Sequence, residues 1–121
     1  MKNTKQNLIR QRSFDFALMI VNVYKELKID KREYILSNQL LRCGTSVGAM
    51  IREAEHAESK ADFVHKLSVA LKEANETQYW LELLNASGMI EKDLFDSLYD
   101  ESDQIISILI TIIKKLKGFN K

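Results

Sequence analysis

The sequence of 121 residues contains no proline, four glycines and one cysteine. All-β domains need many tight turns, and turns depend on glycine and proline, so the composition argues against a sandwich or a barrel. The scarcity of glycine also disfavours a glycine-rich phosphate-binding fold. A single cysteine, Cys43, permits neither an intrachain disulfide nor a multi-cysteine zinc site.

Long apolar runs are absent as well. No segment approaches the roughly 18 apolar residues of a membrane span, and the N-terminus lacks the apolar core of a signal peptide. We therefore expect a cytoplasmic protein without a membrane partner. Apolar residues nevertheless make up 45% of the chain and charged residues 29%, which is typical of a globular protein with a buried core. The length predicts a single domain, residues 1–121.

Charge is unevenly distributed, although the net charge is only +1. Residues 1–12 and 114–121 each carry four basic residues and no acid, whereas all 17 acidic residues lie between these two segments. Basic ends are typical of proteins that contact phosphates, but lysine-rich ends also keep a small protein soluble. Charge alone leaves both interpretations open.

Apolar residues recur at spacings of three and four along the chain, which predicts helices. The expected helices cover residues 13–28, 32–57, 60–86 and 92–117. Short connections favour an all-α, antiparallel up-down-up-down four-helix bundle. We expect Ser13 and Ser59 to be N-caps, with Asp62 in the capping-box position, and Gly88 and Gly118 to end the third and fourth helices.

The first two helices have contrasting patterns. In the first, the predicted core-facing residues are Phe14, Ala17, Leu18, Val21, Tyr24 and Leu27. In the second, a seam with a period of 3.5 passes through Gly44 and Gly48 without a change of phase. Each glycine inside a helix costs about 1 kcal/mol relative to alanine. We expect one continuous helix that another helix approaches closely, and a break into two helices is the alternative.

The last two helices carry more apolar surface than one bundle interior requires. The third has aromatic residues beside its seam, and the fourth is apolar on more than one side. This surplus predicts self-association, and a thicker core is the alternative. The candidate interface residues are Tyr79, Trp80, Ile106 and Ile110.

Several segments match one known family in order and spacing. They are FDFA (14–17), LLRCGTSVGAMIREAE (40–55), SKADFVHKLSVALKEA (59–74) and ETQYWLELL (76–84). They resemble the bacterial four-helix-bundle family also called the 23S ribosomal RNA intervening-sequence proteins, over about residues 8–117. The sequence departs from the family pattern at Met50, where members often carry asparagine.

The resemblance implies an antiparallel bundle with no established enzymatic activity that assembles as a ring, typically a homopentamer. The accessory variability proteins of diversity-generating retroelements look like relatives, and they bind nucleic acid and a reverse transcriptase. Nucleic-acid binding is therefore implied by the resemblance and not by the periodicity.

Basic residues of the matched segments and of the C-terminus are the candidate phosphate contacts. Arg42 and Arg52 are ten residues apart, nearly three turns, and are expected to share a face. The full set is Arg42, Arg52, Lys60, Lys66, Lys72, Lys114, Lys115 and Lys117. The alternative is ion pairing, with acids four residues away on the third helix or between subunits of a ring.

Metal binding and catalysis have weaker support. Glu53 with His56, and Asp62 with His65, have the Glu/Asp-x-x-His spacing that di-iron bundles use. Both pairs flank the expected seams instead of lying on them, so we expect no metal site. Cys43 lies on a core seam, and no nucleotide-binding motif is present, so no catalytic residue and no cofactor are expected.

These observations lead to one functional hypothesis and one alternative. The first is a non-enzymatic, oligomeric four-helix bundle that binds RNA, DNA or a nucleoprotein partner, such as a nucleic-acid enzyme, through its basic residues. The second is a protein-only assembly scaffold that makes no contact with nucleic acid.

Overall fold

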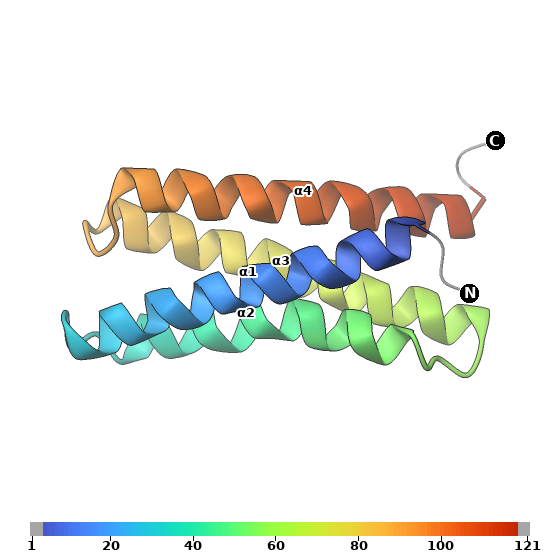
Figure 1. Ribbon diagram of the computed structural model, residues 1–121, viewed down its shortest axis with the longest axis horizontal. Coiled ribbons are helices and arrows are strands. Elements are labelled where there is room, and N and C mark those ends of the chain that lie inside the picture. Colours follow the sequence, from blue (N-terminus) through green and yellow to red (C-terminus); the bar gives the residue numbers. More distant parts are fainter. Residues whose placement is uncertain (1–3, 119–121) are drawn as a thin grey trace.

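The computed structural model describes residues 4–118, and of residues 4 and 5 only the backbone is described. Its helices are α1 (Thr4–Ile29), α2 (Ile35–Ala54), α3 (Lys60–Ala86) and α4 (Lys92–Leu116). They alternate in direction, so α1 begins and α4 ends at the same end of the bundle (Figure 1). The predicted all-α class and four-helix bundle are confirmed. No helix among the described residues has both the length and the apolar character that crossing a bilayer requires.

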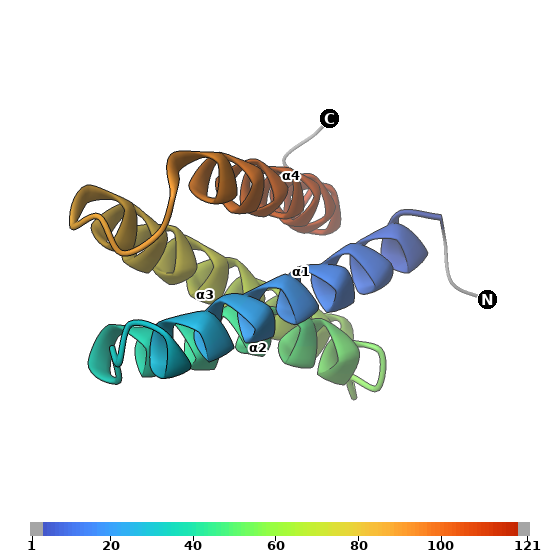
Figure 2. The ribbon, with the colours of Figure 1, turned by 60° about the vertical axis from the view of Figure 1, so that its left-hand side comes forward.

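Each helix packs against its neighbour in sequence, and α1 closes the bundle against α4. The α1–α4 pair packs least extensively of the neighbouring pairs, and α1 crosses the bundle at an angle to α4 (Figure 2). Burying each large apolar side chain stabilises the fold by about 1.5–3 kcal/mol. Fully buried core residues are Phe16, Ile20, Leu27, Leu40, Leu81, Leu84, Leu98, Ile105 and Leu109.

Helix α1 begins nine residues before its predicted start, at Thr4. The prediction that Ser13 caps this helix is therefore wrong. Ser13 is buried in the middle of α1, where its hydroxyl donates to the carbonyl oxygen of Arg10 at 3.1 Å. A serine that bonds to the preceding turn satisfies its own polar group and needs no helix end.

The buried face of α1 also differs from the prediction. Phe16 and Ile20 are completely buried, whereas Phe14 and Leu18 are 49% and 51% exposed. Two apolar stripes therefore run along this helix, and the stripe predicted to face the core is the outer one. Only Leu27 belongs both to the predicted stripe and to the fully buried core.

Helix α2 is shorter than predicted at both ends. Arg32 adopts a left-handed conformation with φ of 53°, which breaks the helical path before α2. The Glu33 carboxylate then accepts hydrogen bonds from the first three backbone amides of α2, at 3.2, 3.1 and 2.7 Å, and fixes its start. At the other end, the amides of residues 55–57 bond three residues back instead of four, which closes the helix.

The continuity of α2 through its glycines is confirmed. A Cβ atom on Gly44 would lie 2.9 Å from the γ carbons of Ile20, and one on Gly48 would lie 3.3 Å from the backbone oxygen of Ser13. Both neighbours belong to α1. The absence of side chains at these two positions therefore allows α1 and α2 to pack closely.

The expected helix ends around α3 and α4 are confirmed. The Ser59 hydroxyl accepts a hydrogen bond from the Asp62 amide at 3.0 Å, as an N-cap does. The Asp62 carboxylate accepts from the amide of Glu58 at 3.2 Å, one residue before the amide that a standard capping box uses. Gly88 and Gly118 have φ values of 78° and 76°, the left-handed geometry that follows a helix end.

Candidate nucleic-acid interface

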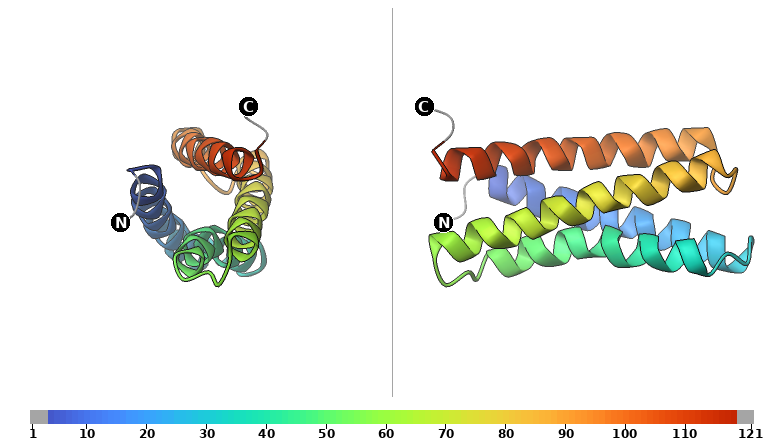
Figure 3. Two further views of the ribbon diagram at one scale, coloured as in Figure 1. Left: turned by 90° about the vertical axis from the view of Figure 1, so that its right-hand side faces the viewer. Right: turned by 180° about the vertical axis from the view of Figure 1, so that it is seen from behind.

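The even number of antiparallel helices brings the two basic segments of the sequence to the same end of the bundle. We call this the terminal end: the first turns of α1, the connection between α2 and α3, and the last turns of α4 (Figures 1 and 3). Basic residues from all four helices lie in this part of the bundle. They are Arg10, Arg12, Arg52, Lys60, Lys66, Lys114, Lys115 and Lys117. Lys2 and Lys121 lie outside the described residues.

Acidic residues at the terminal end are largely engaged in local contacts. Glu53 pairs with Lys66 at 3.4 Å, and Glu55 pairs with Arg10 at 2.9 Å. Asp62 accepts a backbone amide, as described above. At the opposite end, around the α1–α2 and α3–α4 connections, acidic and basic residues are mixed in sequence. The bundle is therefore most cationic where the basic segments meet.

Six of the predicted phosphate contacts are exposed and make no ion pair with any described residue: Arg52, Lys60, Lys72, Lys114, Lys115 and Lys117. The Arg52 guanidinium lies near the Phe14 ring of α1, which leaves the five lysines available. All except Lys72 lie at the terminal end. Lys114 and Lys115 occupy the last turn of α4, where positive charge also interacts favourably with the helix dipole.

Arg42 is part of a contact between helices within the bundle. Its guanidinium pairs with Glu73 at 3.5 Å and donates to Glu76. Glu76, the acid four residues after Lys72 in α3, therefore pairs with Arg42 of α2 and not with Lys72. About half of the Arg42 side chain is exposed, so the pair contributes little stability by itself.

Lys66 is also used within the bundle. It pairs with Glu53 of α2, and not with Asp62, the acid four residues before it in α3. Packing of α2 against α3 therefore overrides the local i,i+4 spacing.

The prediction that Arg42 and Arg52 share a face is wrong. Arg42 points towards α3, whereas the Arg52 guanidinium lies 5.8 Å from the centre of the Phe14 ring of α1. Ten residues at 3.6 per turn leave an angle of about 80° between the two side chains. The two arginines therefore serve different helix–helix contacts.

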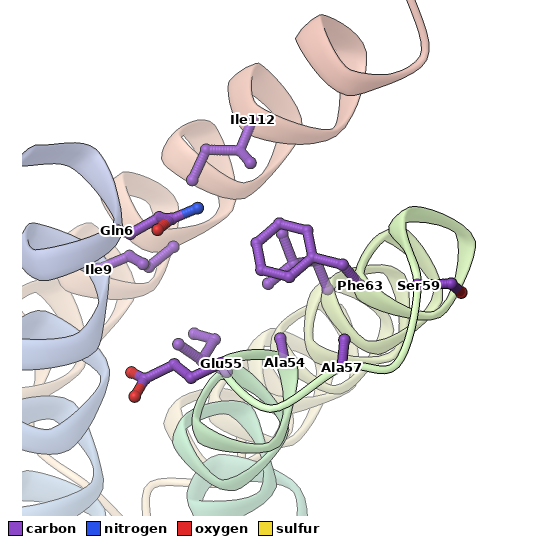
Figure 4. A pocket seen from close by; sticks show the side chains of 10 residues that line it. Gln6, Ile9, Ala54, Glu55, Ala57, Ser59, Phe63 and Ile112 are labelled. Atoms are coloured by element: carbon purple, nitrogen blue, oxygen red, sulfur yellow. The ribbon is translucent and has the colours of Figure 1, made fainter. Parts of the chain in front are cut away.

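A pocket of about 210 Å³ opens at the terminal end, which we call the terminal pocket (Figure 4). Phe63 points into it from α3, opposite Ile112 of α4, with Ile9 of α1 and Ala54 of α2 on its walls (Figure 4). Its other lining residues are Gln6, Ile51, Glu55, Ala57, Ser59 and Leu67. The pocket was not predicted from the sequence, because a seam of apolar residues does not show where the facing helices diverge.

Residues predicted to mediate self-association have mixed exposure. Tyr79 is 57% exposed and Ile110 is 36% exposed. Trp80 and Ile106 are half-buried and pack against the core, and the indole N–H of Trp80 donates to Glu76 at 3.0 Å. The exposed Phe14 and Leu18 of α1, which were predicted to lie in the interior, add apolar surface.

Residues that could bind metal or act as nucleophiles are dispersed. His56 and His65 are exposed, and within residues 4–118 no group of three or more potential ligands is placed to hold a metal ion. Cys43 is fully buried in α2. Burial raises the pKa of its thiol, with a smaller opposing effect from a hydrogen bond with Thr77.

Fold and charge together define a class of protein: a small antiparallel four-helix bundle with one cationic end. The family described as 23S rRNA-intervening sequence protein matches residues 5–111, and the chain belongs to this family. Its fold is similar to the crystal structure of a protein of unknown function from the S23 ribosomal protein family of Bacteroides thetaiotaomicron. The TM-score is 0.91 and the identity 50%, over 92% of this chain and 99% of that one. No curated protein matches the chain.

Proposed function

We propose that this protein is a cytoplasmic, non-enzymatic, self-associating bundle that binds nucleic acid through its terminal end. One observation carries the proposal. Two basic segments at opposite ends of the sequence meet at one end of the fold, where Lys60, Lys114, Lys115 and Lys117 are exposed and make no ion pair with described residues. Unpaired lysines that share a surface are suited to phosphate contacts, which give binding that is strongly salt-dependent.

Family membership supports RNA as the first ligand to test. The family name refers to the intervening sequences of 23S rRNA, and the similar crystal structure belongs to a family named after a ribosomal protein. Both names describe relatives, and the function of the crystallised relative is unknown. A nucleic-acid enzyme bound to the same RNA would be a compatible partner.

Self-association would strengthen such binding. The exposed apolar residues on α1 and on the α3–α4 side offer surfaces for a second copy, among them Phe14, Leu18, Tyr79 and Ile110. In a ring, for which the family resemblance implies five subunits, each copy presents the same lysines. Several weak phosphate contacts then reinforce one another through effective concentration.

The proposal narrows the set of contact residues predicted from the sequence. Arg42 and Lys66 pair with acids of the bundle. The Arg52 guanidinium lies near the Phe14 ring, and Lys72 lies away from the terminal end. We therefore assign the contact to Lys60, Lys114, Lys115 and Lys117.

A protein-only scaffold is the second candidate, favoured by the exposed apolar side chains of α1. The two candidates differ in salt-dependent RNA binding. Fluorescence anisotropy with a structured RNA at two ionic strengths measures it, and light scattering gives the mass of the assembly in parallel.

The decisive variant replaces Lys114, Lys115 and Lys117 with glutamine. We expect at least ten-fold weaker RNA binding, and a slope of log affinity against log salt that is shallower by up to about 0.9 for each phosphate that is no longer neutralised. The matched control replaces three exposed lysines of the opposite end with glutamine, Lys25, Lys28 and Lys31, and should bind almost as the wild type does. Equally weakened binding in both variants, or no binding at low salt, would overturn the assignment. In the second case an intact oligomer would favour the scaffold.

A further inference from the structure

The terminal pocket lies at the same end of the bundle as the lysines assigned to phosphate contact. Its walls are mainly apolar, and the ring of Phe63 points into the opening between α1, α2 and α4 (Figure 4). Drug-sized ligands occupy pockets of about 300–1,000 Å³. A volume of about 210 Å³ therefore suits one planar ring system better than a larger molecule.

Polar groups occupy part of the pocket wall. The Gln6 amide and the Glu55 carboxylate lie on the α1 and α2 sides of the pocket (Figure 4). An amide both donates and accepts hydrogen bonds, and a carboxylate accepts them. This combination complements the edge of a nucleobase, which carries amino donors and carbonyl or ring-nitrogen acceptors.

Basic residues lie close in sequence to lining residues of the pocket on three helices. Lys60 directly follows the lining residue Ser59, and Lys115 lies one turn beyond Ile112 on α4. Arg10 follows Ile9 and pairs with Glu55. If a base enters the pocket, its own phosphate and the adjacent phosphates would therefore lie close to these basic side chains.

We propose that the terminal pocket receives one unpaired nucleobase, which contacts the ring of Phe63 while the flanking phosphates contact the lysines of the terminal end. Proteins that recognise RNA commonly stack splayed-out bases on aromatic side chains. The inference rests on the proposed function and adds a ligand class to it: single-stranded or looped nucleic acid, in preference to a continuous duplex.

The test compares three probes with the same number of phosphates: a single-stranded RNA, a duplex and an abasic oligomer. Two variants alter the pocket without changing its charge. Phe63→Leu removes the aromatic ring, and Ala54→Leu places a larger side chain in the space. Phe95→Leu, at the other end of the bundle, makes the same exchange outside the pocket and is the matched control. Thermal unfolding establishes that each variant is folded.

We expect both pocket variants to bind the single strand roughly five- to ten-fold more weakly, the lower part of the range for loss of one stacked base. Binding of the duplex and of the abasic oligomer should not change, and Phe95→Leu should behave as the wild type. If all probes bind and the folded pocket variants match the wild type, the pocket inference is wrong while the proposed function stands.

Two other results overturn the inference in different ways. If no probe binds even at low salt, the proposed function fails and the pocket inference fails with it. If the pocket variants change the mass of the assembly and leave RNA affinity intact, the pocket holds a side chain of another copy instead of a base.

Discussion

Helices α2 and α3 pack closely through small buried side chains, whereas α1 and α4 cross at an angle and pack less extensively. On the α2–α3 side the buried residues include Cys43, Ala70 and Ala74. Ion pairs from Arg42 and Lys66 cross the same boundary at two levels of the bundle. Small side chains let two helices remain close over many turns, so this side of the bundle is continuous.

The α1–α4 side is held together differently. Among the described side chains, the polar contacts between these helices come from Arg12, which pairs with Glu101 at 3.7 Å and donates to Gln104. Pockets of about 210 and 340 Å³ lie beyond this contact, one at each end of the bundle. Both pockets open at ends of the bundle, and residues of α1 and α4 form part of the lining of each. The closely packed side supplies the rigid support for these pockets.

Exchanging an alanine for leucine on each side is the strongest way to test this comparison. Ala74 is 1% exposed in the close α2–α3 packing, and Ala54 is 2% exposed but lines the terminal pocket. We expect Ala74→Leu to lower the free energy of unfolding by about 1–3 kcal/mol, because the added carbons have no space. Ala54→Leu should change it by less than about 1 kcal/mol, because the pocket accepts the larger side chain. Urea denaturation measures both values, and equal decreases would contradict the contrast in packing.

The glycines of α2 give a second, smaller test, at the boundary with α1. A Cβ on Gly44 would be 2.9 Å from the γ carbons of the fully buried Ile20, which cannot move away easily. The overpacking exceeds the gain of about 1 kcal/mol in helix propensity, so we expect Gly44→Ala to destabilise the protein by about 1–2 kcal/mol. Gly48→Ala meets the Ser13 carbonyl oxygen at 3.3 Å and should cost less than about 1 kcal/mol. A more stable Gly44→Ala variant would show that α1 is free to move outwards on this side too.

The sequence predicts the bounds of α3 correctly, but it does not predict which face of α1 is buried. Helix α3 has the predicted bounds, Lys60–Ala86, because its seam is regular and Ser59 caps it. In α1 two apolar stripes compete, and the choice between them depends on which one packs against Gly44 and Gly48 of α2. That is a tertiary contact, and the periodicity of α1 contains no information about it.

The candidate interface was predictable only in part, because contacts between helices cannot be read from the spacing within one helix. The basic segments are visible in the sequence, and four alternating helices place them at one end. The partners of Arg42 and Lys66 were not predictable, because they depend on the register between α2 and α3 and not on spacing within one helix. The terminal pocket depends on the angle between α1 and α4, which follows from packing of the whole bundle.

The buried thiol gives the smallest expected effect and reports on the close α2–α3 side. Burial raises the pKa of Cys43 above its ordinary value of 9.0, so the folded state favours the protonated thiol. This contribution to stability is complete below pH 9 and is lost as the pH rises through the folded pKa. Urea denaturation measures the free energy of unfolding of the wild type and of Cys43→Ala at each pH. Above pH 9 we expect this free energy to decrease more in the wild type than in Cys43→Ala.

Thiol labelling compares the two sides directly. In the native protein Cys43 should react slowly, because it is buried and little thiolate forms. A cysteine placed at the half-buried Ala57 of the terminal pocket, in the Cys43→Ala chain, should react much faster. Similar labelling rates at the two positions would mean that α2 and α3 separate as readily as the terminal pocket opens. The two sides would then differ in how closely their helices pack on average, but not in the free energy of local opening.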